Sequence, residues 1–120
     1  MAFVIEEIPD SATLFRRIHE AHLVGGRVSS AAYNDSRLSV NWENYSDVQK
    51  AVGAKTAAVT ALVAGVCRSI GQTVEHTPVE ATPEIESNQA HAEICGHKTK
   101  PIKQRLRDLA VEVWRRPLAA

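Results

Sequence analysis

The stretch Val28–Trp42, VSSAAYNDSRLSVNW, decides the fold class of this chain. In its second half, apolar Leu38, Val40 and Trp42 alternate with polar residues, and this is the period of a strand with one buried face. The cluster Asn34–Ser36 favours a turn between two extended runs. We therefore expect a β-hairpin over residues 28–42.

Upstream of this hairpin, residues 12–22 are predicted to form a helix that Asp10-Ser11 could cap. Leu14 and Ile18 are four positions apart, which suits one face of a helix. A strand over residues 14–18 is the alternative. Gly25-Gly26 ends the element in either case.

Downstream of the hairpin, a buried middle helix is predicted over about residues 47–70. The sequence Ser46-Asp47-Val48-Gln49 has the form of a capping box, and the segment that follows is rich in small apolar residues. Gly71 offers a C-terminal stop.

The C-terminal third of the chain is predicted to contain short strands near residues 72–76 and 90–95 and a final helix. We expect this helix over about residues 99–115, with Pro101 in its first turn and Pro117 after its end. Its apolar stripe consists of Ile102, Leu106, Leu109 and Val113.

These elements predict one α+β domain over residues 1–120. We expect a small, mainly antiparallel sheet, packed on one face by the middle and C-terminal helices. The length of 120 residues and the hydrophobic share of 44% suit a globular protein with its own core.

Composition also limits the location and the partners. The N-terminus lacks the basic start and apolar run of a secretory signal, and the most apolar run, residues 57–67, is too short to span a bilayer. We therefore expect a cytoplasmic protein with no membrane partner and without a disulfide between Cys67 and Cys95, its only cysteines. The formal net charge is zero, which disfavours nucleic acid as a partner.

The most chemically suggestive stretch is Asn88–Cys95. On a strand, His91, Glu93 and Cys95 share one face while Ala92 and Ile94 point to the core. A zinc site needs at least three converging ligands, and three side chains on one strand do not converge easily. The sequence therefore assigns no metal and no cofactor, although it leaves metal binding by His19, His22, His91 or Cys95 open.

The string Asn88-Gln89-Ala90-His91-Ala92-Glu93-Ile94 resembles the His-Ala-Glu motif of zinc-dependent nucleoside and base deaminases. The resemblance implies a zinc ligand at His91 and a proton shuttle at Glu93. The family also needs a downstream Pro-Cys-x-x-Cys, and no cysteine follows Cys95. Since two of the three zinc ligands are missing, we do not expect deaminase chemistry.

The order Arg16-Arg17, Ser29-Ser30 and Glu93 is similar to that of ADP-ribosyltransferase-like folds. The resemblance implies that the arginine and serine orient NAD and that the glutamate polarises its ribose. The chain is short for that fold, and the spacing between the arginines and the serines is tight.

Our first functional hypothesis is a small enzyme with a His/Glu acid-base pocket for a polar, nucleotide-like or phosphate-bearing substrate. The acidic loop over residues 77–88 would act as its lid. The candidate catalytic residues are His91, Glu93, His76 and Arg17, the last as an anion holder, and the candidate binding residues are Ser29, Ser30, Lys103 and Arg107.

Two alternatives from other classes stay open. The first is a non-catalytic protein-interaction module or a homo-oligomer that uses the hairpin or the basic C-terminal helix. The second is a binder of phosphate or nucleic acid through that helix and the residues before it, namely Lys98, Lys100, Lys103, Arg105 and Arg107. The sequence does not decide whether the protein is an enzyme.

Overall fold

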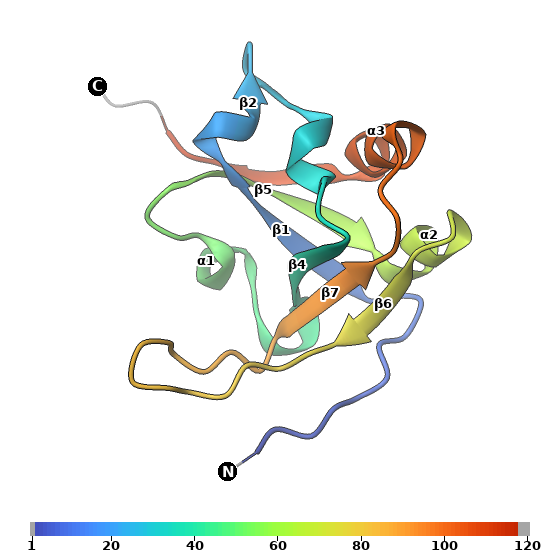
Figure 1. The fold of residues 1–120 in the computed structure, drawn as a ribbon. Helices are drawn as coiled ribbons and strands as arrows, with labels where there is room; N and C mark the ends of the chain where they lie inside the picture. The colour runs from blue at the N-terminus through green and yellow to red at the C-terminus, as the bar shows by residue number, and fades with distance from the viewer. Residues whose placement is uncertain (1, 118–120) are drawn as a thin grey trace.

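The computed structural model describes residues 2–117 and contains a six-stranded antiparallel sheet in the order β6-β7-β4-β1-β5-β8 (Figure 1). Its strands are β1 (Thr13–His19), β4 (Arg37–Trp42), β5 (Thr56–Val63), β6 (Thr73–His76), β7 (His91–Cys95) and β8 (Val111–Arg115). A two-stranded sheet joins β2 (Leu23–Val24) to β3 (Arg27–Val28). The α-helices are α1 (Val48–Ala51), α2 (Ala64–Ser69) and α3 (Lys100–Leu109), and the 3-10 turns are η1 (Glu20–His22), η2 (Ser30–Tyr33) and η3 (Glu43–Tyr45). The predicted α+β class with a mainly antiparallel sheet is confirmed.

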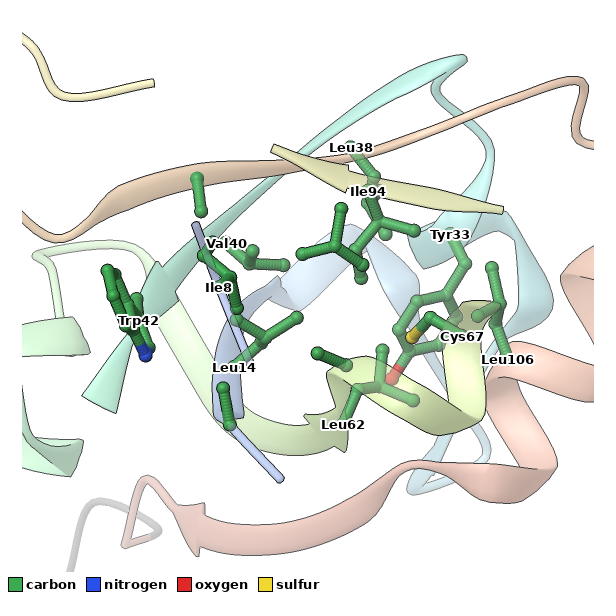
Figure 2. Close-up of a cluster of buried hydrophobic side chains, with 14 of the residues drawn as sticks. Ile8, Leu14, Tyr33, Leu38, Val40, Trp42, Leu62, Cys67, Ile94 and Leu106 are labelled. Carbon is green, nitrogen blue, oxygen red and sulfur yellow. The ribbon is translucent and has the colours of Figure 1, made fainter. Parts of the chain in front are cut away.

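One face of the six-stranded sheet, which we call the inner face, carries the main hydrophobic core. Tyr33 from η2, Cys67 from α2 and Leu106 from α3 pack together there over the sheet (Figure 2). The Tyr33 hydroxyl is hydrogen-bonded to Thr60 Oγ1 at 2.7 Å, which satisfies both buried polar groups. The sheet residues of this core are Leu14, Ile18, Leu38, Val40, Trp42, Ala58, Leu62, Val74, Ala92 and Ile94.

The opposite face, which we call the outer face, has two halves. Over β1 and β5, Ala51 of α1 packs against Phe15 and Val59, and Trp114 of β8 is half-buried against them. We call this the covered half. On β4, β7 and β6 the same face carries exposed or half-buried polar side chains, which form the open half: Arg37, Ser39, Glu75, His91, Glu93 and Cys95.

The predicted hairpin over 28–42 is only half right. Its second strand is β4, but residues 30–33 form the turn η2, and the real hairpin is β2–β3. Gly25 and Gly26 both have positive φ, +58° and +78°, which is the backbone that a tight two-residue hairpin turn requires. This turn pairs Leu23 with Val28 and so removes residue 28 from any pairing with β4.

The middle helix predicted over 47–70 is wrong. Only residues 48–51 and 64–69 are helical, and β5 lies between them. β5 is an interior strand between β1 and β8, so it is largely buried on both faces. A strand buried on both faces lacks the alternation of apolar and polar residues, and its alanines favoured the helical interpretation.

The helix predicted over 12–22 is also wrong, since residues 13–19 form β1, the strand alternative. Leu14 and Ile18 lie on the inner face because a spacing of four keeps one face of a strand as well as of a helix. The C-terminal helix predicted over 99–115 ends at Leu109, and Val113 belongs to β8. The strands predicted near 72–76 and 90–95 are confirmed as β6 and β7.

The segment between β6 and β7 extends their hairpin as an arm, which we define as residues 77–90. Val79 and Asn88 pair across the arm with backbone hydrogen bonds of 2.9 and 2.8 Å. Beyond them, residues 80–87 form an exposed tip. None of the helices within residues 2–117 is long and apolar enough to cross a membrane.

Candidate functional site

A cleft of about 590 Å³ lies between α1 and the arm, where the covered and open halves of the outer face meet. Its floor includes Arg17 of β1 and Asn41 of β4, which both point from the outer face of the sheet. Most of its lining is polar or charged. The lining residues are Arg17, Asn41, Tyr45, Ser46, Lys50, Val79, Ile85, Glu86, Ser87, Asn88 and Gln89.

Arg17 is fixed at the cleft by the end of α1. Its Nε donates a hydrogen bond to the Ala51 carbonyl oxygen, and its Nη2 approaches the Lys50 carbonyl oxygen at 3.4 Å. These carbonyls belong to the last turn of the helix, where backbone acceptors have no partner within the helix. The contacts orient the guanidinium and use only part of its five N–H donors.

Asn41 and Asn88 tie the arm to the floor of the cleft. Asn88 Nδ2 donates to Asn41 Oδ1 at 2.8 Å, and Asn88 Oδ1 accepts a hydrogen bond from the Ala90 amide at 3.1 Å. Asn41 is buried, so this bond satisfies an amide that would otherwise be costly to bury. The arm is therefore held against the sheet by a specific side-chain contact.

Tyr45 and His76 connect the cleft to the N-terminal segment. The Tyr45 hydroxyl donates to the Glu6 carboxylate, and this hydrogen bond raises the pKa of Tyr45. The Tyr45 ring stacks on the ring of His76 with centroids 6.0 Å apart.

His76 is 4% exposed and lies on the inner face beside Trp42. Its Nδ1 accepts from the Glu6 amide at 3.0 Å, and its Nε2 donates to the Gln89 carbonyl oxygen at 2.7 Å. Both ring nitrogens are thus engaged with the backbone. The histidine holds the N-terminal segment and the arm together, and it does not face the cleft.

His91 is half-buried in the open half, on β7 opposite Asn41. Its Nδ1 lies 2.9 Å from the Thr77 carbonyl oxygen and 3.0 Å from the Thr77 hydroxyl. A bond to the carbonyl requires Nδ1 to carry a proton, so in the neutral imidazole Nε2 is an acceptor. Nε2 lies 3.3 Å from Ser39 Oγ, and in that neutral form the serine hydroxyl donates to it.

Glu93 faces the same half of the sheet but is paired. Arg37 donates to its two carboxylate oxygens at 3.0 and 3.2 Å, and this contact holds the pKa of Glu93 below its usual value. Glu75 stands directly opposite Glu93 across β6 and β7, and Arg37 Nη2 also reaches Glu75 at 3.2 Å. The arginine thereby offsets the repulsion between two opposed carboxylates.

Cys95 completes this network. Its thiol donates to Glu75 Oε2 at 2.9 Å. Burial, together with this hydrogen bond, raises the pKa of the Cys95 thiol to about 11. Because the thiolate is the reactive form of cysteine, the site suppresses nucleophilic chemistry at this residue.

The structure brings some of the predicted site residues together and leaves others apart. His91 and Glu93 share the open half, Arg17 lines the cleft, and His76 lies on the inner face. The predicted binding residues lie elsewhere. Ser29 caps η2, Ser30 begins that turn, Lys103 donates to Asn34 at 3.0 Å, and Arg107 pairs with Asp108 at 2.9 Å.

Sequence reasoning missed Ser39, Asn41, Tyr45 and Lys50. The alternation in β4 could have indicated the first two, because it places Arg37, Ser39 and Asn41 together on the face opposite the core. A polar residue that is buried in a strand, as Asn41 is, then needs a specific partner. No comparable pattern indicates Tyr45 and Lys50, whose positions depend on η3 and α1.

Within residues 2–117, no group of three or more His, Cys, Asp or Glu side chains is placed to hold a metal ion. Comparison with protein-family models, curated proteins and solved structures found no match.

Proposed function

We propose that this protein binds a small polar ligand with a phosphate or carboxylate group in the cleft between α1 and the arm. The observation that carries the proposal is the presence of Arg17 and Lys50 in one cleft of about 590 Å³. This volume lies within the range of about 300–1,000 Å³ that is typical of small-molecule sites, and the mainly polar lining suits a polar ligand.

Two features support an anionic group on this ligand. Arg17 is held in place by the carbonyls of α1, so a ligand would meet a guanidinium that is already oriented. The Lys50 side chain makes no hydrogen bond and no ion pair within residues 2–117. Its charge is therefore available to a ligand.

The amide side chains of the lining add orientation. Gln89 offers its amide group on the arm side of the cleft, and Asn41 and Asn88 offer the donor and acceptor capacity that their mutual hydrogen bond leaves unused. These groups suit a ligand with several hydrogen-bonding atoms. The apolar side chains of Val79 and Ile85 provide a smaller hydrophobic contact area.

The test is an NMR titration of isotope-labelled protein with inorganic phosphate and, separately, with acetate. We expect amide shifts around residues 45–50 and 85–89, and at least about 10-fold weaker binding in Lys50→Gln, since a hydrogen bond to a charged group contributes about 1.5–3 kcal/mol. Lys100→Gln, at the exposed start of α3, is the matched control and should bind like the wild type. Equal affinity in Lys50→Gln, or shifts confined to α3, would contradict the proposal.

A second candidate function is hydrolysis or acyl transfer through Ser39 and His91. The specific observation in its favour is the 3.3 Å contact between Ser39 Oγ and His91 Nε2, with Nδ1 of the histidine oriented by Thr77. A nucleophile beside a base that a third group orients is the arrangement of nucleophilic catalysis.

A fluorophosphonate probe tests this second candidate. The serine oxygen would form a bond to phosphorus, fluoride would leave, and the hydroxyl proton would pass to His91 Nε2. We expect labelling that Ser39→Ala and His91→Gln abolish and that Ser30→Ala, in η2 and away from this pair, does not change. An unlabelled wild type, or a labelled Ser39→Ala variant, rejects this function.

A further inference from the structure

The cleft is lined by charged side chains of both signs, and these form no ion pair with each other within residues 2–117. Arg17 and Lys50 approach from β1 and α1, whereas Glu86 approaches from the tip of the arm. Within residues 2–117, Glu86 makes no hydrogen bond and no ion pair. Arg17 donates to backbone carbonyls and not to a carboxylate.

Unpaired opposite charges on two walls of one cleft suit a ligand that has a charge of each sign. A plain anion would meet Arg17 and Lys50 but would also meet the Glu86 carboxylate, which is unfavourable at short range. A ligand with an ammonium group as well would turn that repulsion into a charge-assisted hydrogen bond.

We infer that the ligand of the cleft is a zwitterionic short peptide with free termini. This inference rests on the proposed function, since it assigns the peptide carboxylate to Arg17 and Lys50. It adds that Glu86 receives the terminal ammonium group.

The rest of the lining fits a peptide between these two ends. Asn41, Asn88 and Gln89 carry the same amide donors and acceptors as a peptide backbone, so they can hydrogen-bond with it. Ile85, which is 55% exposed, and Val79 provide apolar contacts for small side chains. The volume of about 590 Å³ lies within the range for ligands larger than a single small ion.

The arm connects Glu86 to the sheet beside the cleft. Asn88 anchors the base of the arm to Asn41, while the tip that bears Glu86 is exposed. Because the cleft is lined by residues of the sheet and of the arm, a peptide bound in it would contact both.

Three peptides of one length test the inference by NMR titration: trialanine, N-acetyl-trialanine and trialanine amide. The acetylated peptide lacks the ammonium group and the amide lacks the carboxylate. We expect trialanine to bind at least about 10-fold more tightly than either, because each modification removes one charged hydrogen bond.

Variants on the arm test whether Glu86 causes the preference for trialanine over N-acetyl-trialanine. Glu86→Gln should bind trialanine and N-acetyl-trialanine equally. Glu84→Gln is the matched control, since Glu84 is on the same tip but does not line the cleft, and it should keep the preference of the wild type.

The outcomes separate this inference from the proposed function. If N-acetyl-trialanine binds as tightly as trialanine, or if acetate binds while trialanine does not, the zwitterion is rejected and anion binding stands. If phosphate, acetate and all three peptides fail to bind, both are rejected. A preference for trialanine that Glu86→Gln leaves unchanged also overturns the role of Glu86.

Discussion

The two halves of the outer face differ although the same sheet carries them. Phe15 and Asn41 are paired across β1 and β4 and mark the boundary. On the side of Phe15, α1 and Trp114 pack on an apolar cluster of Phe15 and Val59, whereas beyond Asn41 the side chains are polar. The comparison shows that α1, although only four residues long, determines which part of the outer face is buried and contributes to stability. The side chains of the other part stay accessible to a ligand.

The largest expected difference between the halves is in stability. Phe15→Ala removes a ring that is 6% exposed beneath α1, and we expect it to lower the free energy of unfolding by about 3–5 kcal/mol. Ser39→Ala, in the open half, should change it by no more than about 0.5 kcal/mol. Urea denaturation measures both, and similar losses would show that the two halves do not differ as described.

The reactivity of the two cysteines compares the core, which contains Cys67, with the open half, which contains Cys95. Burial raises the pKa of both Cys67 and Cys95 to about 11 from an ordinary value near 9. At pH 8, Cys95 should have about 100-fold less thiolate than an ordinary thiol. Since a more basic thiolate is intrinsically more nucleophilic, the net alkylation rate should be only about 10-fold slower.

Iodoacetamide labelling followed by mass spectrometry checks this rate. Cys67, in the core, should be protected until the protein unfolds. Glu75→Gln removes the charge beside Cys95 and should accelerate its labelling. A Cys95 that reacts as fast as a cysteine in an unstructured peptide would contradict the hydrogen-bonded network.

A smaller effect on stability is expected from weakening α1, the helix that covers Phe15. Asp47 caps α1 by accepting a hydrogen bond from the Lys50 amide at 2.8 Å. Asp47→Ala should cost about 1 kcal/mol, while Asp47→Asn should keep most of the stability because asparagine also caps helices well. Urea denaturation midpoints measure both variants. Equal losses of stability would contradict a capping role for Asp47, because asparagine would then fail to replace it.

The smallest expected effect is the pH dependence that comes from Glu93. Arg37 holds the pKa of Glu93 below its usual value near 4.5 in the folded protein, so the pair stabilises the fold above that value. This contribution is lost as the pH falls through the lower, folded pKa. At pH 7, Glu93→Gln should lower the free energy of unfolding by less than about 1 kcal/mol. Between pH 5 and pH 3 the variant should lose less stability than the wild type. Unfolding curves at several pH values measure this, and parallel pH profiles for the two proteins would be the contrary result.

The part of the open half that lies on β7 could be predicted from the sequence, because alternation is visible where only one face of a strand is buried. β4 and β7 are such strands, and the shared face of His91, Glu93 and Cys95 follows from their spacing alone. β5 was not predicted as a strand, and for β1 the strand was the alternative to a helix. Leu14 and Ile18 fit both periods, and the residues of β5 are largely buried on both faces.

The cleft could not be predicted for the same reason. Once residues 47–70 are interpreted as one helix, Lys50 and Tyr45 have no relation to Arg17. The C-terminal boundary failed in a similar way, since Leu109 and Val113 keep the spacing of a helix although the helix ends between them. No glycine or proline marks that change at Ala110.

The strand order has a consequence for the rate at which this protein reaches its native state. β4 pairs with β7 and β5 pairs with β8, which joins residues more than fifty positions apart, such as Arg37 with Cys95 and Ala58 with Arg115. Each pairing closes a long loop before its contacts contribute, so the entropic barrier is high. We expect refolding from urea in milliseconds to seconds rather than microseconds, with the central strand β1 gaining protection from hydrogen exchange before the edge strand β8.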